Sequence, residues 1–247
     1  MSIGDRAIDP DDSFSPARAL FRKLVHFFSY HFILKRDRVT STRVAGLDLT
    51  VLPSVFHPKI FVTSGFFAQF LQSLDMTGKS VVEVGTGSGI LALSAAKAGA
   101  ASVLALDINP KAVETAQLNA ERNGLRQVTA LESNLFSAVP ASAQFDVIIS
   151  SPPSFSGEPR DAADRAWHAG PGYRDIVPLF AQAAVRLKAD GRMYLLLSSD
   201  TNIALFDSLI ASAGFVSQRV ATRSIWVEAF YLYELKLERR AAEAAFA

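Results

Sequence analysis

The sequence contains no cysteine, which excludes disulfides, cysteine nucleophiles and cysteine-ligated zinc. Only four histidines are present, and they lie far apart without a spacing typical of metal ligands, so we expect no metal site. The net charge of +1 gives no argument for a nucleic-acid partner from the chain as a whole. With 49% hydrophobic and 20% charged residues, the 247 residues fit one globular domain with an extension.

A long hydrophobic run is also missing. In the candidate helix over residues 17–35, the stretch uninterrupted by Lys or Arg runs only from Leu24 to Leu34, whereas a transmembrane helix needs about 20 residues. A clean apolar segment followed by a small-residue cleavage site is lacking too, so we expect no signal peptide. These absences lead us to expect a cytoplasmic protein.

The first 60 residues predict an N-terminal extension with three parts. Residues 1–16 are acidic and poor in core residues, and residues 17–35 have the apolar stripe of an amphipathic helix. Between residues 17 and 43 there are seven basic residues against one acid, which suits substrate capture, an anionic partner or a membrane surface. The alternative is a lid helix packed on the domain. Residues 43–56 alternate around a glycine turn and predict a hairpin.

Residues 81–89 run from a short apolar strand into three alternating glycines. Gly85, Gly87 and Gly89 can adopt positive φ and let a ligand approach the main chain closely. A helix predicted over residues 90–97 presents unpaired N–H groups that favour a carboxylate or phosphate. The glycines alone do not decide between a methyl donor and a dinucleotide as the ligand. The dinucleotide fingerprint does not match when it is counted from the end of the strand, but it does match when it is counted from the second glycine.

Two further predicted strands end in polar motifs. Asp107 follows the strand over residues 102–106 and can accept hydrogen bonds from both hydroxyls of a ribose. The strand over residues 145–150 runs into Ser-Pro-Pro-Ser at residues 151–154. Because ligand chemistry gathers at the carboxyl ends of parallel strands, we expect these motifs and the glycines at one edge of a sheet.

Together, the glycine motif, Asp107 and the Ser-Pro-Pro-Ser run resemble the class I S-adenosylmethionine (SAM)-dependent methyltransferases. More narrowly, they are similar to the HemK-type glutamine methyltransferases and other small-domain methyltransferases. The resemblance implies a Rossmann-like, doubly wound α/β sheet of about seven strands in the order 3, 2, 1, 4, 5, 7, 6, the seventh antiparallel. We expect an extension over residues 1–60, a SAM-dependent methyltransferase domain over residues 61–237 and a tail over residues 238–247.

The resemblance also implies SAM as cofactor and assigns residues to it. Glu83 and the glycine loop would hold the methionine end, Asp107 the ribose, and Asn134 the adenine. A turn explains Asn134 equally well, as a helix N-cap explains Thr63. The residues expected to contact SAM are Thr63, Glu83, Gly85, Thr86, Gly87, Gly89, Asp107, Ile108, Asn134, Leu135 and Ser150.

Similar enzymes carry the motif Asn/Asp/Ser-Pro-Pro-Tyr/Phe at this place. In them, the polar first residue and the carbonyl of the first proline bind a planar amino group of the acceptor. Acceptors aimed at its N–H groups increase the nucleophilicity of its delocalised lone pair. Here Ser151 and Pro152 match these roles, whereas Ser154 replaces the aromatic and leaves Phe155 one position late. Two adjacent prolines also serve simply to end a strand.

Residues 156–172 form a long predicted loop, and such loops are usually functional or disordered. Trp167 would either close over a substrate or hold the loop down. His168 can act as a base. We therefore expect Ser151, Pro152 and His168 to be catalytic. The expected substrate contacts are Ser154, Phe155, Trp167 and Tyr173.

The favoured function is SAM-dependent N-methylation of a small molecule, an amide or an exocyclic amine. Methylation of RNA or of a protein side chain, and O-methylation, are the alternatives within the class. An NAD-dependent oxidoreductase and a non-catalytic SAM-binding protein are the alternatives from other classes.

Overall fold

The computed structural model describes residues 38–57, 62–225 and 228–238. The acidic arm, the amphipathic helix and nearly all of the tail fall outside these ranges, so the expectations for those segments and the domain division stay predictions. In the described part of the chain, no helix has both the length and the apolar character needed to cross a membrane.

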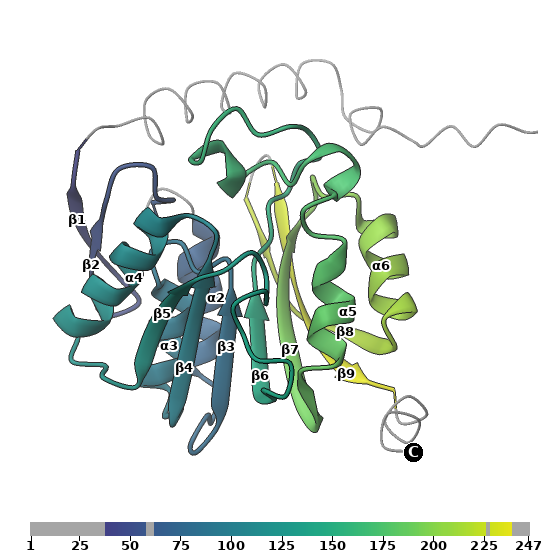
Figure 1. Ribbon diagram of the computed structural model, residues 1–247, viewed down its shortest axis with the longest axis horizontal. Coiled ribbons are helices and arrows are strands. Elements are labelled where there is room, and N and C mark those ends of the chain that lie inside the picture. Colours follow the sequence, from purple (N-terminus) through teal and green to yellow (C-terminus); the bar gives the residue numbers. More distant parts are fainter. Residues whose placement is uncertain (1–37, 58–61, 226–227, 239–247) are drawn as a thin grey trace, which may run out of the picture.

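Seven strands form one sheet in the order β5-β4-β3-β6-β7-β9-β8 (Figure 1). All neighbouring pairs are parallel except those of β9, which runs antiparallel to both β7 and β8. The predicted strand order with an antiparallel last strand is therefore confirmed. The strands are β3 Ser80–Val84, β4 Ser102–Asp107, β5 Val128–Glu132, β6 Phe145–Ser150, β7 Leu187–Ser198, β8 Phe215–Ser224 and β9 Ala229–Leu237.

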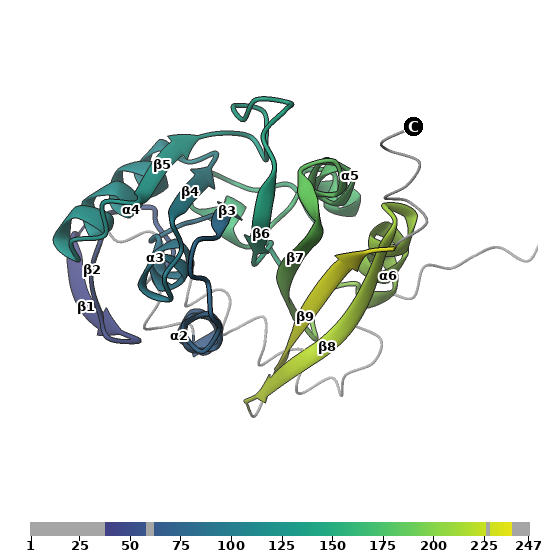
Figure 2. The same ribbon diagram turned by 90° about the horizontal axis from the view of Figure 1, so that it is seen from below.

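Helices cover both faces of the sheet, which makes it doubly wound (Figure 2). On one face lie α2 Val62–Gln72, α3 Ile90–Lys97 and α4 Pro110–Arg122, and on the other lie α5 Pro178–Ala184 and α6 Ile203–Ser212. The central strands β3 and β6 are therefore buried from both sides, which explains their nearly continuous apolar runs. Two hydrophobic clusters fill the layers, one centred on Phe67 and Leu93, the other on Phe180 and Phe206.

From the sequence we also predict one helix over residues 173–187, but the structure differs at the start of this segment. The structure has a 3-10 turn over Pro171–Tyr173 and begins α5 only at Pro178. Gly172 and Tyr173 adopt positive φ values of 62° and 59°, which an α-helix does not allow.

The hairpin predicted over residues 43–56 is present as β1 Thr40–Val44 and β2 Leu47–Val51. It packs on α4 and contributes Leu47 and Leu49 to the main core. The buried side chain of Asn119 on α4 accepts from Thr50 N (2.7 Å) and donates to Thr50 O (2.8 Å) and Ser88 O (2.9 Å). Asn119 therefore connects the hairpin to the glycine loop.

We expect Asn119→Ala to lower the free energy of unfolding by about 3 kcal/mol, because it leaves three buried backbone groups without a partner. Asn123 is a matched control, since its side chain makes the same pair of bonds to Asp48, but near solvent. Asn123→Ala should cost about 1 kcal/mol or less, because water replaces the lost partners. Chemical denaturation of both variants measures the difference, and equal losses would contradict the role given to Asn119.

Candidate functional site

A cavity of about 730 Å³ opens where the carboxyl ends of β3, β4, β5, β6 and β7 meet the start of β9. Its volume lies in the range of ordinary ligand pockets. The predicted site residues that line it are Thr63, Glu83, Gly85, Thr86, Gly87, Asp107, Ile108, Asn134, Leu135, Ser150, Ser151, Pro152, Ser154, Phe155, Trp167 and His168. Gly89 and Tyr173 are the predicted residues that do not line it. The sequence motifs thus meet in one cavity.

The glycine loop presents bare backbone to this cavity. Gly85 and Gly87 have φ values of 83° and 52°, and a Cβ built on either would meet no described atom within 4 Å. The loop is held from behind, because the N–H groups of Gly85 and Thr86 both donate to Leu106 O (2.9 Å). The open space on the cavity side and the hydrogen bonds to Leu106 on the other side allow a ligand to approach the main chain closely.

Gly89 lies behind the loop, against α4, rather than at the cavity. It is the N-cap of α3 with φ 83°, and a Cβ added there would stand 3.0 Å from the Ala116 Cα. Glycine is therefore required at this position for helix packing and backbone conformation.

The Asp107 carboxylate joins the glycine loop to the next loop. Its Oδ2 accepts from Gly87 N (2.8 Å) and its Oδ1 from Asn109 N (2.9 Å). Burial raises the pKa of Asp107, although these backbone donors oppose the shift. Each oxygen keeps acceptor capacity, so the carboxylate can still bind two adjacent hydroxyls. The N-cap of α4 is Asn109, whose side chain accepts from Lys111 N (3.0 Å).

Glu83 is the most deeply buried ionisable residue lining the cavity, with 1% of its surface exposed. Its Oε2 accepts from the Thr86 hydroxyl (2.6 Å) and from Ala92 N (2.8 Å). Burial nevertheless raises the pKa of Glu83 to about 8, and the neighbouring Asp107 adds to the shift. Burial therefore favours the protonated form of Glu83.

Apolar and amide groups lie beside Asp107 at the ends of β4 and β5. Ile108 keeps 40% of its surface exposed, and Asn134 is also exposed. Leu135 is held at a positive φ of 51°, and its carbonyl accepts from the Ser133 hydroxyl (2.8 Å). The Ser150 hydroxyl donates to Val84 O (3.0 Å) and ties the end of β6 to the end of β3. This end of the cavity suits a flat heterocycle with polar edges.

Tyr173 supports the Ser-Pro-Pro-Ser run from behind instead of facing the cavity. Only 4% of the surface of Tyr173 is exposed. Its hydroxyl donates to Ser154 O (2.9 Å) and accepts from Asn202 N (3.1 Å). Its ring packs edge-on against Phe206 of α6 at 5.3 Å between centroids. The expectation of a substrate contact at Tyr173 is thus replaced by a structural role, because its hydroxyl is used within the protein.

The loop after β6 folds back on Phe155. Phe155 N donates to Trp167 O, and Ala169 N donates to Phe155 O, both at 2.9 Å. Trp167 is 8% exposed and packs with Phe56 and Phe155, so it holds the loop down and also lines the cavity. The packing role of Trp167 is therefore observed, whereas closure over a substrate stays a prediction.

His168 is held by the same loop. Its Nδ1 lies 3.2 Å from Oδ1 of the buried Asp164, whose carboxylate also accepts from the Arg160 guanidinium (2.9 and 3.0 Å). The imidazole is tilted against the Phe155 ring at 5.8 Å. The contact with Asp164 is an ion-pair distance and not a hydrogen bond within the described residues, so a catalytic role for His168 stays a prediction.

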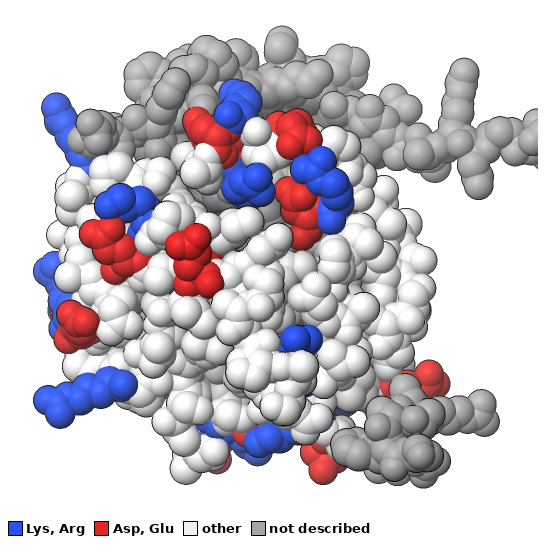
Figure 3. Space-filling view, viewed as in Figure 1, with Lys and Arg blue, Asp and Glu red and all other residues white. Residues whose placement is uncertain are grey.

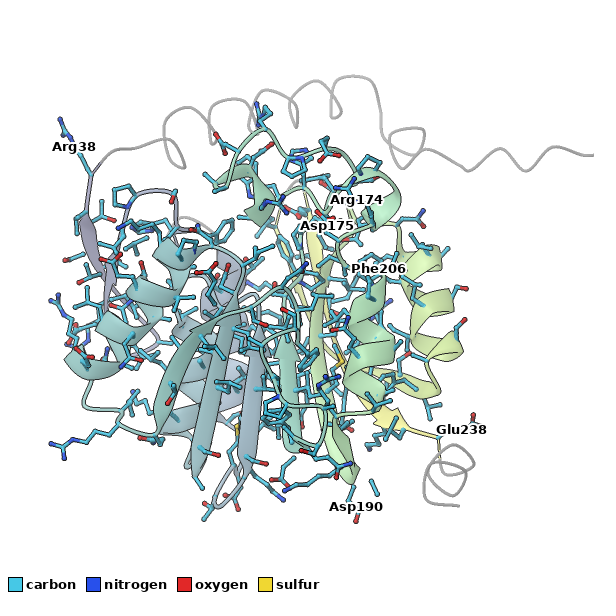
Figure 4. The ribbon with its side chains drawn as sticks, viewed as in Figure 1. Arg38, Arg174, Asp175, Asp190, Phe206 and Glu238 are labelled. Atoms are coloured by element: carbon cyan, nitrogen blue, oxygen red, sulfur yellow. The ribbon has the colours of Figure 1, made fainter. Side chains whose placement is uncertain are left out.

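Charged side chains alternate in sign on the outside of this loop, at the top of the view in Figure 3. Arg174 pairs with Glu158 (3.2 Å) and Asp175 (3.0 Å), and Arg165 pairs with Asp175 (3.4 Å). Arg174 and Asp175 lie side by side above α5 in Figure 4. Arg165 and Asp175 also line the cavity, so the network borders its mouth.

Sequence reasoning missed the far end of the cavity. There the Ser198 hydroxyl at the end of β7 donates to Glu228 Oε1 at the start of β9 and accepts from Asp200 N (2.9 Å). Leu196 and Phe230 complete this end. No motif marks these residues, because they meet only through the antiparallel pairing of β7 with β9.

Comparison with known proteins agrees with this architecture. Residues 62–151 match the family model described as ribosomal protein L11 methyltransferase (PrmA). A ribosomal protein L11 methyltransferase of Escherichia coli (strain SMS-3-5 / SECEC) is 43% identical over 93 residues, which are 38% of this chain and 30% of that protein. The chain thus spans about a third of the length of the curated relatives it matches.

Solved structures extend the similarity to most of the chain. A 16S rRNA methyltransferase (RsmC) of T. thermophilus, in complex with AdoMet and guanosine, aligns with a TM-score of 0.61 and 24% identity over 81% of this chain and 50% of that chain. A ribosomal protein L11 methylase of Lactobacillus delbrueckii subsp. bulgaricus aligns with a TM-score of 0.56 and 22% identity over 75% of this chain and 84% of that chain. The chain has the Rossmann-like fold of class I SAM-dependent methyltransferases. Its place in the HemK-like branch stays a prediction.

Proposed function

We propose that the protein is a SAM-dependent methyltransferase. One observation carries the proposal: the open glycines, the Asp107 carboxylate and the Ser151-Pro152 run all line one cavity, although 66 residues separate the first from the last. The match to a methyltransferase family model covers the glycine loop and Asp107 and ends at Ser151. A structural neighbour that binds AdoMet supports the choice of cofactor.

In this proposal, each motif binds one part of the cofactor, whose sulfonium supplies an activated methyl group. Gly85 and Gly87 give the methionine end access to the backbone, and Glu83 receives its ammonium group. Asp107 accepts from the ribose hydroxyls. Ile108 and Leu135 cover the adenine faces, and the exposed Asn134 reaches its amino edge. Thr63, Thr86 and Ser150 complete the polar lining.

We propose a nitrogen of a macromolecule as the acceptor, and a protein nitrogen before RNA. The expectation of a small-molecule acceptor has less support, since the named relatives act on ribosomal protein L11 or on 16S rRNA. Protein ranks first because the 43% match is to L11 methyltransferases and the net charge of +1 provides no broad attraction for RNA.

The transfer itself depends on positioning. The Ser151 hydroxyl and the Pro152 carbonyl border the cavity next to the glycine loop, where they can orient the N–H groups of an acceptor. His168, fixed by Asp164, can take a proton from an acceptor that arrives as an ammonium ion. Phe155 and Trp167 would pack on the acceptor side chain.

A nicotinamide-dependent oxidoreductase is the main rival from another class. The glycine loop and Asp107 would serve it equally, but the Ser-Pro-Pro-Ser run has no role there. A methyltransferase uses all three groups of lining residues.

Methyl-labelled SAM tests the proposal when the protein is incubated with ribosomal proteins, with RNA and with free amino acids. We expect label in the protein fraction and about a tenfold fall in the transfer rate for Ser151→Ala, because one orienting hydrogen bond is lost. SAM affinity should be unchanged in that variant. Label in RNA alone would replace the acceptor class, and no transfer to any fraction would contradict the enzymatic function.

A further inference from the structure

We propose that Glu83 couples SAM binding to the release of a proton and thereby makes the cavity select ligands that carry an ammonium group. This inference rests on the proposed function and deepens it. Its basis is the position of a buried carboxyl group at the inner wall of the cavity.

The first step is that the protein surrounds Glu83 with too few donors to stabilise a charge. Both of its hydrogen bonds, from the Thr86 hydroxyl and from Ala92 N, reach the same oxygen, Oε2. Within the described residues, Oε1 has no hydrogen-bond partner, although Glu83 lines the cavity. A carboxylate with 1% exposure and no counter-cation among the described residues is costly, so burial favours the protonated group.

The second step is that, among the residues the structure describes, the elements packed around Glu83 bring no cation. Its neighbours in register are Ala105 on β4 and Ile149 on β6. The basic residue of α3, Lys97, lies at the other end of that helix and donates to Gly46 O. The negative charge of Asp107 also favours the protonated form of Glu83. The other described ionisable residues that line the cavity belong to its β6, β7 and β9 side: Arg165, His168, Asp175 and Glu228.

The third step is that a bound ammonium group supplies the missing charge. An ammonium within hydrogen-bond reach of Oε1 favours the carboxylate and lowers the pKa of Glu83 from its raised value of about 8. Below that pH, binding therefore expels the proton. SAM affinity should then fall about tenfold for each pH unit below the raised pKa, because one proton must leave for each ligand bound.

Calorimetric titration at about pH 6.5, below the ordinary pKa of an amino group, measures this coupling. Titrations in phosphate and in imidazole, whose ionisation enthalpies differ, give the number of protons released. We expect close to one proton per SAM in the full chain. The matched ligand is 5′-methylthioadenosine, which keeps the adenosine and a sulfur atom, as a neutral thioether in place of the sulfonium, but lacks the amino-acid group, and it should release none.

The matched variant is Glu83→Gln, which preserves size and hydrogen bonding but has no proton to lose. It should bind SAM without proton release and with an affinity that is constant between about pH 6 and 7.5. If this variant does not fold, the comparison of the two ligands with the wild-type chain still decides. SAM binding without proton release would overturn the inference and leave the proposed function standing. Failure of both ligands to bind would overturn the proposed function, and the inference with it.

Discussion

Replacing Asp107 with alanine is expected to weaken SAM binding by about ten- to hundredfold. Charge-assisted hydrogen bonds such as those to ribose hydroxyls contribute about 1.5 to 3 kcal/mol, and 1.4 kcal/mol corresponds to a factor of ten. The carboxylate also accepts from Gly87 N, so its loss frees the middle of the glycine loop. The dissociation constant by calorimetry measures the combined effect.

Glu132 provides the control for this substitution. It pairs in register with Asp107 on the adjacent strand β5, but it is exposed and does not line the cavity. Glu132→Ala removes the same charge from the same edge of the sheet and should leave the SAM affinity unchanged. Equal affinities of the Asp107 variant and the wild type would refute the ribose contact, whereas equal losses in both variants would show a general effect of charge.

Replacing Gly89 with alanine is expected to lower the free energy of unfolding by about 3 kcal/mol. A left-handed conformation costs a residue with a Cβ about 1 to 2 kcal/mol, and forcing a methyl group into a packed contact costs about 1 to 3 kcal/mol more. Both terms apply, because Gly89 has φ 83° and its Cβ would lie 3.0 Å from the Ala116 backbone. Thermal or chemical denaturation measures the loss.

Gly85 allows the strain and the packing to be separated. It has the same φ of 83°, but a Cβ there would point into open space. Gly85→Ala should therefore cost about 1 kcal/mol of stability, while its methyl group enters the cavity and weakens SAM binding. The two variants should thus show opposite profiles, one losing mainly stability and the other mainly affinity. A Gly89 variant of normal stability would contradict the packing role.

The sequence predicted the fold because its signals are local. Apolar runs such as residues 81–84 mark buried strands, and Asn109-Pro110 marks the start of a helix. The carboxyl-edge rule then brought Asp107 and Ser151 together without any contact information. The order of the strands came from the resemblance, since spacing along the chain does not determine which strands pair.

The errors and omissions have a common cause, namely contacts between distant parts of the chain. Gly89 and Gly85 belong to the same alternating glycine motif, so the sequence does not distinguish them. Only the packing of α4 against Gly89 shows that this glycine does not face the cavity. The hydroxyl of Tyr173 is hydrogen-bonded to Ser154 O and Asn202 N and is therefore not available to the cavity. Glu228 meets Ser198 across 30 residues through a β-pairing that no local motif records. Tertiary pairing, rather than residue type, decides which of these side chains reach the cavity.

Binding of SAM to the wild-type chain, titrated in parallel with NAD(H), tests the central claim most directly. We predict that SAM and its demethylated product S-adenosylhomocysteine each bind one site per chain and raise the unfolding temperature, while NAD(H) gives no response, because ligands that bind the native state stabilise it. A response to NAD(H) without one to SAM or S-adenosylhomocysteine would contradict the assignment of this cavity to a methyl donor.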